Sequence, residues 1–133
     1  MTSIQGEKLV LREMRGKVVL VNFWATDCAV CLQKMPAMAD LYRRLQSRPF
    51  EAVFVAMPHD RPDHVLAYTK RSALPFKVAL DVQGELARAF DGVAVTPMTF
   101  IVDKRGRIVR RIVGDLDTEV LREFIEDRIA EST

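Results

Sequence analysis

Two apolar runs and one helical repeat dominate the first half of this chain. Val18–Trp24 and Ala52–Met57 are almost continuously apolar, which is typical of strands buried on both faces of a sheet. From Cys28 to about Gln46 the apolar residues recur at spacings of three and four, which predicts a helix. Pro36 lies inside that helix and predicts a kink, because proline cannot donate a hydrogen bond to the carbonyl of Leu32.

The rest of the chain continues the alternation of strands and helices. We expect a short strand at Leu9–Leu11, a helix from Arg61 to about Ser72 and a shorter helix over Gly84–Phe90. Two further strands, Thr99–Val102 and Ile108–Val113, are separated by a hairpin-type loop. Arginines in the second of these strands suit the edge of a sheet.

Two helices have recognisable ends and apolar faces. Pro62 lies in the first turn of the helix that begins near Arg61, and Asp117 or Thr118 can cap the last helix. The residues expected to be buried are Val65, Leu66 and Tyr68 in the former helix, and Val120, Leu121, Phe124, Ile125 and Ile129 in the latter. The pattern as a whole predicts an α/β fold in which helices flank a central mixed sheet.

Composition and charge exclude several classes of protein. A chain of 133 residues with 49% hydrophobic and 29% charged residues is expected to form one soluble domain, residues 1–133. Its net charge of +2 is too small to indicate nucleic acid or an anionic membrane as the main partner. No apolar run approaches the ~20 residues of a membrane span. Charged residues such as Glu7 and Lys8 interrupt every candidate secretory leader, so we expect either a cytosolic protein or a trimmed, mature one.

The two cysteines, Cys28 and Cys31, form a single C-x-x-C. One pair is neither a disulfide framework for a domain of this size nor a four-thiolate zinc site. The pair follows a predicted buried strand and begins a predicted helix, where the helix dipole and free backbone N–H groups stabilise a thiolate. We therefore expect redox chemistry, with Cys28 as the exposed nucleophile and Cys31, one turn later, as the residue that forms a disulfide with it. Two structural cysteines, or half a metal site, are the alternative.

The residues around the cysteines resemble a known family. Phe23–Cys31 resembles the active-site stretch of thioredoxin-like thiol–disulfide oxidoreductases. Arg15–Ala25 and Met35–Pro36 are closer to the TlpA-like branch, some of whose exported or membrane-tethered reductases serve cytochrome c maturation. Residues 84–109, with Thr96–Pro97 before a strand, resemble the second half of that branch. The resemblance therefore covers nearly the whole chain and implies a thioredoxin fold, with a short N-terminal strand and a small helical insertion before the proline strand.

The resemblance also implies how the site works. Thr96–Pro97 corresponds to the family's cis-proline corner, where the residue before the proline binds an extended substrate through its backbone. Trp24 and Pro97 are expected to shape the docking groove for protein substrates that carry disulfides. No organic cofactor is implied, but an upstream dithiol reductant is. We further expect a monomer, in the periplasm or otherwise outside the cytoplasm, joined to a membrane only through a leader or anchor that this sequence does not contain.

Three positions depart from the family pattern. Asp27 stands where a tryptophan often precedes the first cysteine, and its carboxylate is expected to disfavour the Cys28 thiolate. Lys34 replaces the branch's usual glutamate, and its cation is expected to favour a thiolate. Asn22 occupies the position of the buried acid of thioredoxins and cannot take a proton, so no general base for Cys31 is evident. Asp27 and Lys34 as solvated surface charges of little effect are the alternative.

A second function of a different class uses the same cysteines. Soft sulfur ligands bind copper(I), so Cys28 and Cys31 with Met57, Met98 or a histidine are the candidate ligands of a copper-handling protein. As core or rim residues the methionines need no further explanation. The two histidines, His59 and His64, and the basic segment from Lys104 to Arg111 are expected to be ordinary surface features.

Overall fold

The computed structural model describes residues 1–132 and contains one five-stranded sheet with the strand order β3-β2-β1-β4-β5. β1, β2 and β3 are parallel to one another, whereas β4 is antiparallel to β1 and β5 is antiparallel to β4. The expected mixed sheet is therefore confirmed. The elements in chain order are the 3-10 helix η1 (Leu11–Met14), β1 (Val18–Trp24), α1 (Ala29–Leu45), β2 (Phe50–Ala56), α2 (Pro62–Arg71), β3 (Lys77–Leu80), α3 (Glu85–Ala89), β4 (Met98–Val102), β5 (Ile108–Val113) and α4 (Thr118–Ala130).

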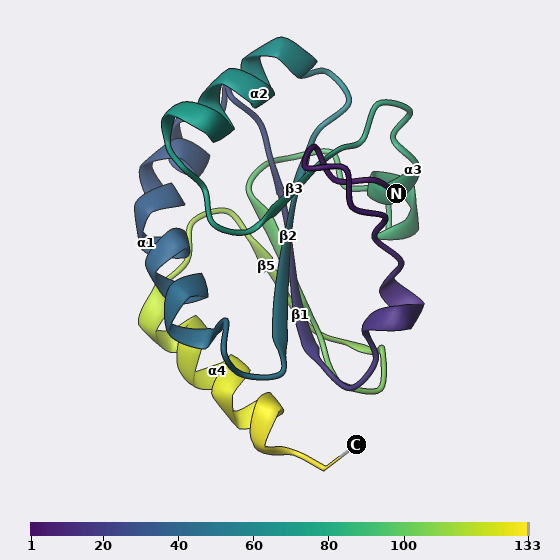
Figure 1. Cartoon of the computed structure of the whole chain (residues 1–133), viewed down its shortest axis with the longest axis vertical. Helices are drawn as coiled ribbons and strands as arrows, with labels where there is room; N and C mark the ends of the chain where they lie inside the picture. Colours follow the sequence, from purple (N-terminus) through teal and green to yellow (C-terminus); the bar gives the residue numbers. More distant parts are fainter. Residues whose placement is uncertain (133) are drawn as a thin grey trace.

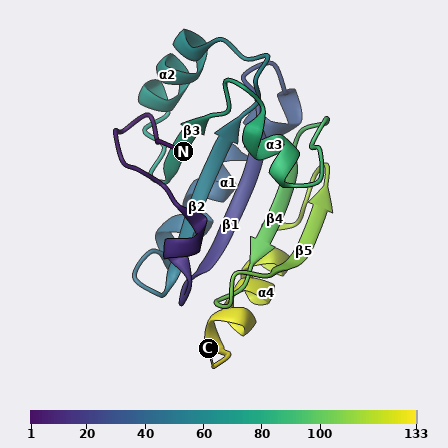
Figure 2. The ribbon, with the colours of Figure 1, turned by 90° about the vertical axis from the view of Figure 1, so that its right-hand side faces the viewer.

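The helices cover the two faces of the sheet unequally. α1, α2 and α4 lie on one side, and α3 lies on the other with the N-terminal segment and η1 (Figure 1). The view turned by a quarter shows α3 and η1 in front of the strands and α1 and α4 behind them (Figure 2). β1 has seven buried residues that alternate between the two layers: Leu20 and Trp24 join the core under α1, while Val21 and Phe23 join the core under α3. This explains why its sequence is apolar except at Asn22.

Most predicted elements are confirmed, including the helix that follows Cys28, the cap of the last helix and the exposed edge strand. α1 begins one residue after Cys28 and continues through Pro36 to Leu45. Asp117 caps α4, since its carboxylate accepts hydrogen bonds from the N–H groups of Glu119 and Val120. β5 is an edge strand, as its arginines indicate, and most of its residues are exposed.

The short strand expected at Leu9–Leu11 is wrong. The chain turns at Gly6, and the Leu9 N–H donates to the carbonyl of Met1, so this segment pairs with the N-terminus and forms only an isolated bridge. Ser3, not Leu9, makes the single bridge to the main sheet, at Ala79. Leu9 is nevertheless buried, because it packs under the face that α3 covers.

Two other details differ from the sequence expectation. The edge strand β3 has no counterpart among the predicted strands, because its four residues are too few for a recognisable period. Leu66 and Val120, expected to be buried, are 47% and 55% exposed, because the buried face of α2 and of α4 contains fewer residues than the apolar pattern indicates. Within residues 1–132, no helix is both long and apolar enough to span a bilayer.

Candidate active site

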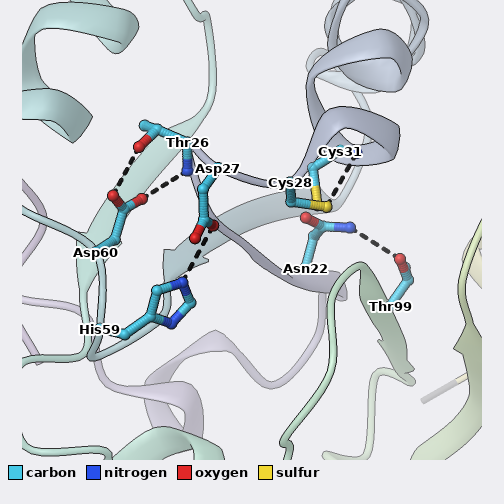
Figure 3. The surroundings of a disulfide bond; sticks show 8 residues. All are labelled: Asn22, Thr26, Asp27, Cys28, Cys31, His59, Asp60 and Thr99. Carbon is cyan, nitrogen blue, oxygen red and sulfur yellow. Dashed lines mark hydrogen bonds and ion pairs between the residues drawn. A yellow bond between two sulfur atoms is a disulfide. The ribbon is translucent and has the colours of Figure 1, made fainter.

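The C-x-x-C lies where β1 ends and α1 begins. Cys28 is the N-cap of α1, and its Sγ accepts a hydrogen bond from the Cys31 N–H at 3.2 Å. The two cysteines form a disulfide (Figure 3). Cys28 is only partly buried, whereas Cys31 is 4% exposed and packs in the core under α1. The sulfur of Cys28 is therefore the one that a substrate reaches.

The helix start also sets the electrostatics of the pair. A thiolate on Cys28 would lie at the positive end of the 17-residue helix α1 and keep the Cys31 N–H as a donor, so both the dipole and the hydrogen bond favour the charged sulfur. Cys31 lies deeper, among apolar side chains, and burial disfavours its thiolate. The geometry thus favours the thiolate at Cys28 and disfavours it at Cys31.

The loop that carries Cys28 is held by the loop that follows β2. Asp60 accepts two hydrogen bonds from Thr26, one from the backbone N–H and one from the hydroxyl, each at 2.6 Å. One residue on, the Asp27 carboxylate pairs with the His59 ring at 3.1 Å (Figure 3). Both side chains of this second pair are more than half exposed, so water screens it. The buried end of the loop is therefore fixed mainly by Asp60.

A cavity of about 10 Å³ lies against Cys31, on the side away from that loop. It is lined by Cys31 and Lys34 of α1, by Pro97, and by Asp115 of the loop between β5 and α4. Lys34 Nζ lies 3.1 Å from an Asp115 carboxylate oxygen. The hydrogen bond from Lys34, with a second from the Leu116 N–H, lowers the pKa of Asp115 below its usual 3.8. The volume is about that of one water-molecule site.

The proline corner completes this side of the site. The Thr96–Pro97 peptide bond is cis. The Pro97 carbonyl accepts a hydrogen bond from the Gly114 N–H at 2.8 Å, which joins the start of β4 to the end of β5. Pro97 is buried and borders the same cavity as Cys31, while Thr96 is partly exposed. Thr96, just before Pro97, therefore lies partly at the surface, next to the cavity that Cys31 lines.

Asn22 lies under the disulfide at the position expected for a buried acid. It is 5% exposed, lines the cavity, and donates its side-chain N–H to the hydroxyl of Thr99 at 2.9 Å (Figure 3). An amide used in this way takes no proton from Cys31. The expectation that this position supplies no base is consistent with its contacts.

The structure contradicts the expected place of Trp24 in the docking groove, and it supports the interpretation of the two candidate methionines as core residues. Trp24 is 0% exposed and packs against Tyr68 with ring centroids 5.6 Å apart, so it supports the loop from below and does not contact a docked substrate. Met57 and Met98 belong to the core under α3, on the opposite face of the sheet from the cysteines. They are core residues and not copper ligands. Within residues 1–132, no three His, Cys, Asp or Glu side chains are grouped as metal ligands would be.

The sequence analysis missed Asp60 and Asp115. A signal for Asp60 existed, since β1 and β2 are adjacent parallel strands and the loops at their carboxyl ends must meet at one edge of the sheet. Asp115 had no comparable signal. It reaches Lys34 because β4 and β5 return the chain to the Pro97 corner, across 81 residues of sequence.

Comparisons with known proteins agree with this geometry. The model of the Redoxin family matches residues 2–128. The thiol-disulfide oxidoreductase ResA of Bacillus thuringiensis subsp. konkukian is 34% identical over 126 residues, which are 94% of this chain and 71% of that protein. A thiol:disulfide interchange protein of the thioredoxin family from Chlorobium tepidum superposes with a TM-score of 0.88 at 25% identity, covering 98% of this chain and 92% of its own. StoA from Bacillus subtilis superposes with a TM-score of 0.82 at 25% identity, covering 93% and 92%.

Proposed function

The chain belongs to the Redoxin family and is a thioredoxin-fold thiol–disulfide oxidoreductase, and from this premise we propose that it works as a reductant of protein disulfides. The resemblance to the TlpA-like branch that the motifs indicate is thereby confirmed. The observation that carries thiol–disulfide exchange in this proposal is the asymmetry of the pair: Cys28 is accessible and caps α1, while Cys31 is buried behind it.

The steps follow from that asymmetry. The Cys28 thiolate attacks one sulfur of a substrate disulfide, the substrate S–S bond breaks, and the departing thiolate takes up a proton. A mixed disulfide now joins Cys28 to the substrate. Cys31 loses its proton and attacks Cys28 Sγ, which expels the second substrate thiol and forms the Cys28–Cys31 disulfide. Two electrons pass from the protein to the substrate, and an upstream dithiol must return them.

The substrate-binding role of the proline corner rests on exposure and position. An extended segment beside Cys28 would pair its backbone with that of Thr96 and pass over Pro97, which borders the same cavity as Cys31. Main-chain pairing of this kind selects an extended chain around a disulfide and tolerates many side chains. Protein disulfides are the substrate class that fits.

The remaining parts of the proposal concern cofactor and location. The two cysteines perform every step above, so the reaction needs no organic cofactor. The resemblance of the motifs to the TlpA-like branch supports a site of action outside the cytoplasm, with an upstream dithiol reductant as the second partner. Copper(I) binding has no support from the positions of Met57 and Met98.

Trapping of mixed disulfides tests the assignment of roles. Cys31→Ser leaves Cys28 able to attack but removes the resolving thiol, so substrate proteins are expected to stay bound to it on non-reducing gels. Cys28→Ser is the matched control and should trap far less, because Cys31 is buried. Equal trapping by both variants would contradict the assignment, and a failure of the unsubstituted protein to reduce an insulin-type protein disulfide would contradict the proposed direction.

A further inference from the structure

The second chemical step needs a thiolate on a residue whose surroundings disfavour one. Cys31 is 4% exposed and packs with Met35, Met38 and other apolar residues. Burial of this kind stabilises the neutral thiol. Asn22, at the position expected for an acid, is engaged with Thr99 and exchanges no proton. Some other feature must stabilise the charged sulfur or receive its proton.

Two charged residues, Lys34 and Asp115, line the same cavity as Cys31. Among the described residues that line it, Lys34 and Asp115 are the ionisable ones besides Cys31. Lys34 stands three residues after Cys31 on α1, so both side chains lie on one face of the helix. Its side chain is 29% exposed, against 66% for Asp115, and its Nζ lies 3.1 Å from the Asp115 carboxylate. Two further carboxylates lie near the motif outside this lining: Asp27 pairs with His59, and Asp60 accepts the hydrogen bonds of Thr26.

The relative basicity of the two groups decides between their roles. The carboxylate of Asp115 has a pKa below 3.8, whereas a free thiol has a pKa of ~8.5. A proton would move from Cys31 to Asp115 against a difference of more than about four pKa units, so Asp115 does not raise the thiolate population. A positive charge near the sulfur does raise it.

We propose that Lys34 is the cation that stabilises the Cys31 thiolate during resolution of the mixed disulfide, and that Asp115 is a positioning residue that holds the Lys34 ammonium at the cavity. The proposal rests on the proposed function, because it concerns the second step of that reaction. Lys34, paired with Asp115, would thus stabilise the charged sulfur of Cys31, which Asn22 does not do.

The two steps can be timed separately with an aromatic disulfide whose thiol is coloured, dithiobis-nitrobenzoate, mixed with the reduced protein in stopped flow. The first burst of coloured thiol reports attack by Cys28, and its rate rises with probe concentration. The second burst reports attack by Cys31 on the mixed disulfide, and its rate does not depend on probe concentration. If the first burst is absent, the proposed function is contradicted. The role of Lys34 is tested by the second burst alone.

We expect Lys34→Gln to raise the pH midpoint of the second burst by about one unit. One unit lowers the thiolate fraction tenfold at pH values below the midpoint, but the more basic thiolate is about threefold more nucleophilic, so the net slowing is about threefold. Above the midpoint the variant should be as fast as the unsubstituted protein or faster. The pH profiles of the two proteins should therefore cross, whereas a merely structural defect would slow the variant at every pH. Lys34→Arg should restore the original midpoint.

Asp115→Asn tests the positioning role. The freed ammonium is expected to turn toward solvent, so the midpoint should rise, though less than in Lys34→Gln, and Asp115→Glu should restore it. Asp40→Asn, which removes an exposed carboxylate paired with Arg43 on the same helix, is the control and should leave both bursts unchanged. An unchanged midpoint in Lys34→Gln overturns the proposal. A lower midpoint in Asp115→Asn overturns the positioning role, because the carboxylate would then only offset the cation.

Discussion

Removing the Asp60 carboxylate is expected to destabilise the loop that carries Cys28. In Asp60→Ala, Thr26 loses both of its 2.6 Å hydrogen bonds across the loops. A hydrogen bond to a charged group contributes about 1.5–3 kcal/mol, but water replaces part of it where the groups are half-buried, as both residues are here. We therefore expect the free energy of unfolding to fall by about 2–3 kcal/mol for the pair. Thr26→Val removes only the hydroxyl donor and should lose about 1 kcal/mol.

Urea unfolding of the oxidised protein measures these losses, because the disulfide then stays the same in every variant. Asp40→Ala is the matched control: it deletes a carboxylate that is 76% exposed, and it should change the free energy by less than about 0.5 kcal/mol. The reasoning is refuted if Asp60→Ala and Asp40→Ala unfold at the same urea concentration. It is also refuted if Thr26→Val is as destabilised as Asp60→Ala, since the backbone N–H bond would then contribute nothing.

Two further predictions concern carboxylates. Asp27→Asn should lower the pKa of Cys28 by a few tenths of a unit, because the deleted charge adjoins the thiolate but is 71% exposed; a thiolate absorbance titration in a variant without the second cysteine measures it, and an unchanged or higher midpoint contradicts it. For Asp103, desolvation raises the pKa, but hydrogen bonds from the backbone N–H groups of Arg107 and Arg105 and from the Arg107 side chain outweigh it, so the pKa lies below 3.8. The stability that Asp103 contributes is thus present above about pH 4 and is lost as the pH falls through the lowered value. Asp103→Asn should lower the free energy of unfolding by about 1–3 kcal/mol at neutral pH. Between about pH 2 and pH 6, the stability of this variant should also depend less on pH than that of the unsubstituted protein. An equal pH dependence in both proteins would show that Asp103 does not cause the loss of stability in acid.

The local parts of this protein were predictable from short stretches of sequence. Val18–Trp24 is apolar except at Asn22 because both faces of the strand are buried, and this pattern can be recognised without knowing its neighbours. Cys28 and Cys31 are three residues apart at a helix start, so their pairing and their unequal exposure follow from helix geometry. The disulfide pair, with Cys28 as the proposed nucleophile, was therefore predictable before any fold was known.

The N-terminal segment and β3 are two parts of the fold that the local sequence pattern did not predict. Leu9 has the apolar character of a strand residue, yet Ser3 makes the bridge to the sheet, because the turn at Gly6 decides which residue faces Ala79. β3 has only four residues, and its pairing with β2 defines it as a strand. In both cases the neighbour across the sheet, not the residue type, determines the outcome.

The sequence by itself thus determined the redox pair, the α/β class and the order of most elements, because each depends on residues within a turn or a strand of one another. Tertiary structure alone decided what surrounds the pair. It buried Trp24, placed Met57 and Met98 on the other face of the sheet, and brought Asp115 to Lys34. These outcomes depend on which strands become neighbours. That choice is made by packing the whole core at once, so no local window of sequence contains it.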